Sequence, residues 1–229
     1  MLPKEELTQR YISNFEQFPP IIQRLEVLPR QHQLAFLACC VERMLLNYYL
    51  VEGLPGWGEK NILKNAMSQI WKIVRGERLD PKYLNCLKED VLECDSDPDD
   101  YYPISEYFVD DEHNDYCKYC VVGTSSICGI ACLLDFSLSD KIEDMLDVFS
   151  TMLGALEDYV TIEQNTKYES REDEMKIISA HPAIQLEAEQ QQSDLENLEK
   201  NPVLNSDLIE KLRLNARNPD LALHKIIEK

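Results

Sequence analysis

LPRQHQLAFLACCVERMLLNYYLVEGLPGWG, residues 28–58, is the stretch that decides the fold. Pro29 is favoured in the first turn of a helix, and the helical pattern that follows it continues to Val51, before a turn rich in glycine and proline. A helix that is apolar on nearly every side is normally the central helix of a globular domain. We therefore predict an all-α fold, a single globular bundle of about eight helices around a buried central helix. From position 33 to 51 the clearly polar residues are Gln33, Glu42, Arg43 and Asn47.

A Glu-Arg pair inside such a helix needs partners or must face a cleft, because unpaired buried charge is expensive. Arg43 and Asn47 are four residues apart and share a face. Glu42 points about 100° away from Arg43, so its partner must come from another helix. Two interpretations stay open: a buried ion pair with an amide that fixes the helix register, or a polar pocket in the bundle. The candidate pocket comprises His32, Glu42, Arg43, Asn47, Trp57 and Trp71.

Further helices follow from the spacing of apolar residues, and the scarcity of glycine, 7 in 229 residues, favours long helices over many strands. Ser170 and His181-Pro182 both indicate helix starts, and Asp140 with Glu143 forms a capping-box pattern. We expect one domain over residues 1–229, with residues 1–20 as an N-terminal helical extension. The expected helices are 2–18, 20–28, 29–51, 61–75, 81–92, 115–136, 141–162, one from 170, one from 182 to about 200, and 207–216 capped by Ser206, with a short strand or helix over 221–227.

The net charge is −19, from 42 acidic and 23 basic residues. Such a surface repels nucleic-acid phosphates and anionic membranes, so we expect neither as a partner. The longest apolar run, Leu34 to Val41, is far too short to span a membrane, and the N-terminus lacks the apolar core of a signal peptide. These features suit a cytoplasmic protein, whose acidity serves either solubility alone or the binding of a basic partner.

Residues 93–112 hold nine acids and no lysine or arginine. The segment from Asp95 to Asp100 carries acids at alternate positions and Glu106 follows eleven residues after Asp95, which echoes a calcium-binding loop. Asp100, however, stands where that loop needs glycine, and the sequence contains no second calcium-binding motif to pair with it. A solvated acidic loop is the alternative. The candidate interaction surface comprises Asp95, Asp97, Asp99, Asp100, Glu106, Asp110, Asp111 and Glu112.

Four of the eight cysteines, Cys117, Cys120, Cys128 and Cys132, follow the pattern C-x2-C-x7-C-x3-C, which raises the possibility of a zinc or iron–sulfur site. On one continuous helix, Cys117 and Cys128 lie ~16 Å apart along the axis, too far for a single metal ion. A four-cysteine site therefore requires a helix break, for which Gly123 is the good candidate. The alternative is that these reduced thiols act as small core residues, and we predict no metal ligand and no cofactor.

Four stretches carry a family resemblance. LPRQHQLAFLACCVERMLLNYYL is followed by GLPGWGEKNILKNAMSQIWKIVRG, and later by HPAIQLEAEQQQSDLENLEK and LIEKLRLNARNPDLALHKI. With His32, Glu42, Arg43 and Trp71 in this order, the chain resembles the YjaG-like proteins of the bacterial domain-of-unknown-function family 416. This resemblance implies an all-helical fold and a cytoplasmic bacterial protein. It implies no established activity, cofactor or catalytic residue.

The sequence contains no G-x-S-x-G motif, no phosphate-binding glycine loop and no dinucleotide fingerprint, so nothing in it demands an enzyme. We hypothesise a non-enzymatic interaction module whose acidic face binds a basic partner. In size, acidity and helical class the chain is similar to bacterial immunity proteins that neutralise toxins, an analogy of class alone. The alternative is a small-ligand-binding protein or enzyme with a pocket around Glu42, Arg43 and Asn47.

Overall fold

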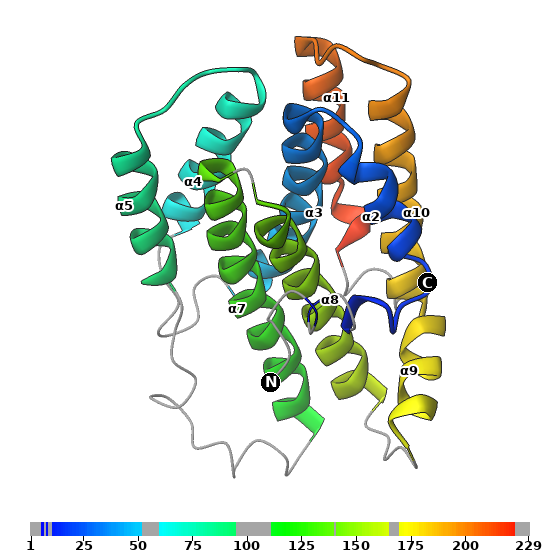
Figure 1. Cartoon of the computed structure of the whole chain (residues 1–229). Coiled ribbons are helices and arrows are strands. Elements are labelled where there is room, and N and C mark those ends of the chain that lie inside the picture. The colour runs from blue at the N-terminus through cyan, green and yellow to red at the C-terminus, as the bar shows by residue number, and fades with distance from the viewer. Residues whose placement is uncertain are drawn as a thin grey trace.

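The computed structural model describes residues 6, 8, 11–51, 60–94, 111–139, 141–164 and 170–222, without the side chains of residues 50, 51, 60 and 111–121. Over these residues the fold is all-α, as the sequence predicts, with no strand (Figure 1). The helices are α2 (Pro19–Glu26), α3 (Arg30–Val51), α4 (Lys60–Val74), α5 (Pro81–Leu92), α7 (Asp111–Leu138), α8 (Ile142–Gln164), α9 (Arg171–Ala180), α10 (Pro182–Glu199) and α11 (Ser206–Ala216), followed by the short 3-10 helix η2 (Pro219–Leu221).

Side-chain caps set several of the helix starts. Asp80 accepts a hydrogen bond from the backbone N–H of Lys82 at the start of α5, and Ser170 accepts one from Asp173 at the start of α9. His181 ends α9 and caps α10 through its ring nitrogen, so the chain restarts a helix there as predicted. The cap of α11 is Asn205 rather than Ser206, one residue earlier than predicted. Each cap satisfies a backbone donor that the first helical turn leaves open.

Helix α3 is the buried central helix of the bundle. It contacts α4, α7, α8, α10 and α11, and in Figure 1 it runs between the α4–α5 pair on one side and α10–α11 on the other. Its residues from Leu34 to Leu45 are all buried. This confirms the prediction from the nearly all-round apolar pattern, because such a helix is stable only when neighbours cover every side.

Helices α7 and α8 form the most extensive helix pair and pack antiparallel along α3 (Figure 1). Gly129 permits the close approach of α7 to α3: a Cβ atom there would lie 3.3 Å from the sulfur and terminal carbon of Met44. The guanidinium of Arg30 lies 3.2 Å from the centroid of the Phe136 ring, and Arg30 donates a hydrogen bond to the carbonyl of Ser139. These contacts fix the α7–α8 turn against the start of α3.

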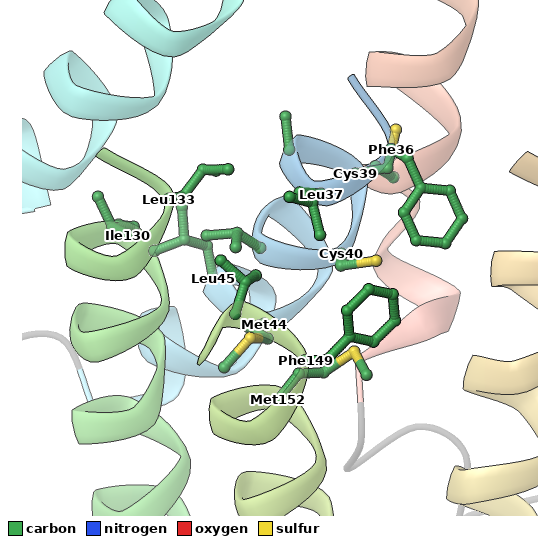
Figure 2. Packing of buried hydrophobic residues seen from close by; sticks show 14 of the residues in the cluster. Phe36, Leu37, Cys39, Cys40, Met44, Leu45, Ile130, Leu133, Phe149 and Met152 are labelled. Carbon is green, nitrogen blue, oxygen red and sulfur yellow. The ribbon is translucent and has the colours of Figure 1, made fainter. Parts of the chain in front are cut away.

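The core between α3, α7 and α8 is apolar and closely packed. Figure 2 shows Phe36 of α3 beside Phe149 of α8, with ring centroids 6.0 Å apart. In the same view Leu45 of α3 lies toward Leu133 of α7, and Met44 lies on the side of Met152 of α8. Burial of these side chains is the main stabilising contribution to such a bundle.

The N-terminal segment differs from its prediction. The helix expected over residues 2–18 ends at Ile12, and residues 13–18 form turns in which the N–H of Phe15 bonds to the carbonyl of Ile12. Both Phe15 and Phe18 are fully buried in this turn. Pro19 then starts α2 instead of merely ending a helix, because proline needs no backbone donor in a first turn.

Several expectations lie outside the described residues: the turn at 52–59, the acidic region 95–110, the residue Asp140 of the proposed capping box, and residues 223–229. Among the described residues, no helix is both long and apolar enough to cross a membrane.

Candidate functional site

The candidate pocket of α3 divides between two faces of the helix. On one face, Glu42 is 4 % exposed and accepts a 2.8 Å hydrogen bond from the indole N–H of Trp71 on α4. Arg217, just beyond α11, donates to both carboxylate oxygens of Glu42, from Nε at 2.8 Å and from Nη2 at 2.9 Å. The partners of Glu42 thus come from other helices, as predicted. The two-pronged contact with Arg217 is a strong, geometrically specific ion pair.

On the face toward α10, Arg43 is also buried and binds two carboxylates of that helix. Its Nε and Nη2 each donate to Glu187 at 2.8 Å, and its Nη1 donates to Asp194 at 2.7 Å. Burial alone would lower the pKa of Arg43, but Glu187 and Asp194 together raise it well above its ordinary value. Burial raises the pKa of Asp194, and Arg43 opposes that shift. The cluster of these three residues therefore carries one excess negative charge in the core when both acids are ionised.

Beside the Arg43 cluster lies a cavity of about 30 Å³. Its polar lining comes from Arg43, Asn47, Glu187 and Gln190, and its apolar walls include Met44, Met152 and Leu221. Because a single water needs about 10–15 Å³ of such volume, the cavity has room for one or two water molecules. A drug-sized or metabolite-sized ligand needs about ten times that space.

Of the other two members of the candidate pocket, the structure describes His32, which does not join these clusters. His32 is buried near the opposite end of α3, where its Nε2 lies 2.9 Å from the carbonyl oxygen of Asn201 in the α10–α11 connection. This contact links the first turn of α3 to the α10–α11 connection. Trp57 lies outside the described residues.

The acidic candidate surface is not described in its side chains. Asp95, Asp97, Asp99, Asp100, Glu106 and Asp110 lie outside the described residues, and Asp111 and Glu112 are described only as the first backbone positions of α7.

The cysteine pattern lies on one helix. Helix α7 runs through Gly123 without a break, so the condition for a single four-cysteine metal site is not met. The side chains of Cys117 and Cys120 are not described. Cys128 and Cys132 are partly buried, and the sulfur of Cys132 lies 3.8 Å from the hydroxyl of Thr151 on α8. Within the described ranges no group of three or more histidine, cysteine, aspartate or glutamate side chains is arranged to hold a metal ion.

The residues that pair with Glu42 and Arg43 were not predicted from the sequence. Glu187, Gln191 and Asp194 follow the same helical stripe as the apolar Ile184 and Leu195, and this spacing was a readable signal that they face the core. Arg213 in the last turn of α11 and Arg217 at its C-cap are four residues apart, so they also lie on one side of the helix end. No local pattern could have paired them with Glu42, which lies 175 residues from Arg217.

Comparisons with known proteins give a family and a fold. The family described as "Protein of unknown function (DUF416)" matches residues 20–222. None of the curated proteins matches the chain. The crystal structure of a DUF416 family protein from Shewanella baltica OS155 is similar, with a TM-score of 0.68 and 19 % sequence identity, over 85 % of this chain and 92 % of the other. At this identity the likeness shows a shared fold.

Proposed function

We propose that this chain, which belongs to the DUF416 family, is a non-enzymatic cytoplasmic protein of bacteria that binds a basic protein partner through an acidic surface. The observation that carries the proposal is the net charge of −19 on 229 residues. A field of one sign speeds the encounter with a partner of the opposite sign and suppresses wrong partners. Charge of this size thus favours a partner rich in lysine and arginine.

The internal pairing of the polar core residues supports the same proposal. Glu42 and Arg43 are both engaged by side chains of other elements at 2.7–2.9 Å. These contacts are those expected of residues that fix helix register. The small cavity beside Arg43 gives no support to a metabolite pocket at this place. The surface, rather than this part of the core, is therefore the better candidate for function.

The topology brings acidic residues to one end of the bundle. Helix α5 ends at Leu92 on the side of the bundle and α7 begins at Asp111 at its lower end (Figure 1), so the nine-acid stretch 93–112 leads to that end. Helix α8 also ends and α9 begins at this end (Figure 1). The first turn of α9 adds Glu172, Asp173 and Glu174. This end is the surface we propose for the partner.

The test is affinity capture with the tagged full chain at low salt, followed by measurement of the dissociation constant of the recovered protein at several NaCl concentrations. The proposal predicts a basic protein that binds in stoichiometric amount and weakens as salt rises. If that protein is a toxin, co-expression of the chain should restore growth to cells that make it, as the analogy to immunity proteins implies. Failure to recover any basic protein overturns the proposal.

A charge-matched pair of variants locates the surface. One variant changes Asp95, Asp97, Asp99 and Asp100 to Asn. The control changes Glu26, Glu77 and Glu189 to Gln and Asp207 to Asn, four exposed acids outside the 93–112 stretch. We expect the first variant to weaken binding by about tenfold or more and the control to change it by much less, because charges beyond a Debye length of about 8 Å are screened. Equal effects would contradict the assignment of the surface.

A further inference from the structure

Three guanidinium groups gather beside Trp71, where the end of α4 meets α11. Arg213 and Arg217 lie four residues apart, one on the last turn of α11 and one at its C-cap, and Arg75 directly follows α4. The guanidinium carbon of Arg213 lies 6.0 Å from the centroid of the Trp71 ring. Burial lowers the pKa of Arg213, and the neighbouring charges of Arg217 and Arg75 lower it further. We refer to Arg75, Arg213 and Arg217 as the arginine cluster.

The carboxylates near the arginine cluster leave Arg213 without a full partner. Both oxygens of Glu42 already accept hydrogen bonds from Arg217, and one of them also accepts the Trp71 N–H. The Nε of Arg213 lies 3.7 Å from that shared oxygen, which is beyond hydrogen-bond range. Glu210 lies 3.6 Å from Arg75 and is half exposed. Among the described residues, three positive charges thus face two negative ones.

Arg213 carries a hydrogen-bond donor, its Nε–H group, that no described residue accepts. Its Nε is buried and has no hydrogen-bond partner in the described part of the chain. Its side chain is 18 % exposed, and those of Arg75 and Arg217 are 34 % and 43 % exposed, so solvent reaches the cluster from one side. A buried donor without an acceptor is unfavourable, because it has lost its hydrogen bonds to water. An oxyanion at the exposed edge of this guanidinium would supply the negative charge that the described residues do not.

We propose that the arginine cluster is a binding site for an oxyanion, a carboxylate or a phosphate group, with Arg213 as its central donor. A guanidinium offers a planar fork of N–H groups that matches both kinds of oxyanion, and its charge strengthens each hydrogen bond. The net charge of the chain is −19, but charges more than about 8 Å away are screened at physiological salt, so the local excess of one positive charge governs the site. The proposal rests on Arg213 and its neighbours and does not depend on the acidic surface of the proposed function.

The first experiment follows the arginine Nε–H signals of the full-length, nitrogen-15-labelled chain by NMR. Sodium phosphate, sodium acetate and sodium chloride are added in separate titrations at equal ionic strength. We expect the Arg213 signal to move and saturate with phosphate, acetate or both, and to stay in place with chloride. Saturation by phosphate alone identifies phosphate as the ligand chemistry, and saturation by acetate alone identifies carboxylate. A shift of equal size with chloride, or no shift with either oxyanion, overturns the proposal.

Two variants and one control make the assignment specific. Arg213→Gln removes the central donor fork, and Arg213→Lys keeps the charge but not the fork. Arg78→Gln removes one charge from an exposed arginine in the α4–α5 connection. With the Arg217 signal or Trp71 fluorescence as the readout, both Arg213 variants should weaken oxyanion binding by about tenfold or more, equivalent to the loss of a charge-assisted hydrogen bond. The Arg78 variant should bind as the wild type does. Unchanged affinity in folded Arg213→Lys would overturn the role of Arg213.

Discussion

Arg43 is the side chain that links α3 to the carboxylates of α10. All three of its nitrogen groups bind the carboxylates of Glu187 and Asp194, at 2.7–2.8 Å and away from solvent. Arg43→Met would leave two carboxylates buried without a counter-charge. We expect the free energy of unfolding, measured in urea, to fall by about 3–5 kcal/mol, the usual cost of breaking a buried ion pair.

An exposed arginine provides the matched control for Arg43. Arg24 makes a comparable two-nitrogen contact with Glu199, at 2.6 and 2.9 Å, but both side chains are 35 % exposed. Arg24→Met should cost less than about 1 kcal/mol, because water and salt screen an exposed pair. Similar losses in the two variants would show that solvent reaches Arg43 as well.

Asp194 gives the same cluster a dependence on pH. Burial raises its pKa above the ordinary value of 3.8, so the folded protein binds this proton more tightly than the unfolded chain does. Ionisation therefore opposes folding, and the stability contributed by the protonated acid is lost as pH rises from about 4 through the higher folded pKa. Asp194→Asn removes that loss while it keeps an acceptor for Arg43.

The measurement is the free energy of urea unfolding across a pH series above 4 for wild type and Asp194→Asn. The wild-type curve should fall more steeply with rising pH than the curve of the variant. Asp158, whose pKa is also raised by burial and by the neighbouring charge of Glu157, contributes a fall of the same sign in both proteins, so it cancels in the comparison. Equal slopes of unfolding free energy against pH in the two proteins would show that ionisation of Asp194 does not destabilise the fold.

Two helical glycines allow the effect of helix propensity on stability to be measured apart from the effect of packing between helices. Gly154 lies in α8, and a Cβ there would meet the Tyr11 hydroxyl at an ordinary 3.8 Å. Gly154→Ala should raise the free energy of unfolding by about 0.5–1 kcal/mol, since alanine forms helix better than glycine. Gly129→Ala in α7 gains the same propensity, but its Cβ must displace Met44 from 3.3 Å.

We therefore expect Gly129→Ala to leave stability within about 0.5 kcal/mol of wild type, because repacking of the flexible Met44 offsets the gain. Urea unfolding of both variants under identical conditions measures the difference between them. A full gain at position 129 would mean that α3 and α7 are not held at the close approach seen between Gly129 and Met44.

The elements themselves could be predicted because their signals are local. Proline at a first turn and an apolar stripe determine α5, whose predicted bounds 81–92 agree with the structure. The buried state of α3 followed from composition alone. The turn at residues 13–18 could not be predicted, because Phe15 and Phe18 fit a helical stripe equally well and only their burial against other elements decides between helix and turn.

The contacts of the candidate site join distant parts of the chain, and for that reason they could not be predicted from the sequence. That Glu42 and Arg43 need partners followed from their burial, but which residues serve them did not. Arg43 meets Glu187 across 144 positions of sequence, and Glu42 meets Trp71 across 29. Such pairings depend on how whole helices pack against one another, and no local sequence pattern encodes that arrangement.

The charge of the whole molecule predicts opposite responses of folding and binding to salt. With 42 acids against 23 bases, the folded chain repels itself, and salt screens that repulsion. The buried pairs of Glu42 and Arg43 are screened little, and exposed pairs contribute little in any case. We therefore expect the melting temperature to rise by a few degrees between low salt and about 0.5 M NaCl, the size of a 1 kcal/mol change in a chain of this length.

Binding to a basic partner should weaken over the same range of NaCl, because attraction between opposite charges is screened as repulsion between like charges is. Calorimetric melting curves of the free chain and titrations of the complex, in the same buffers, give the two slopes. An uncharged osmolyte serves as the control, since it stabilises the fold without screening charge. Slopes of the same sign would mean that the −19 charge is not what attracts the partner, and would leave solubility as its role.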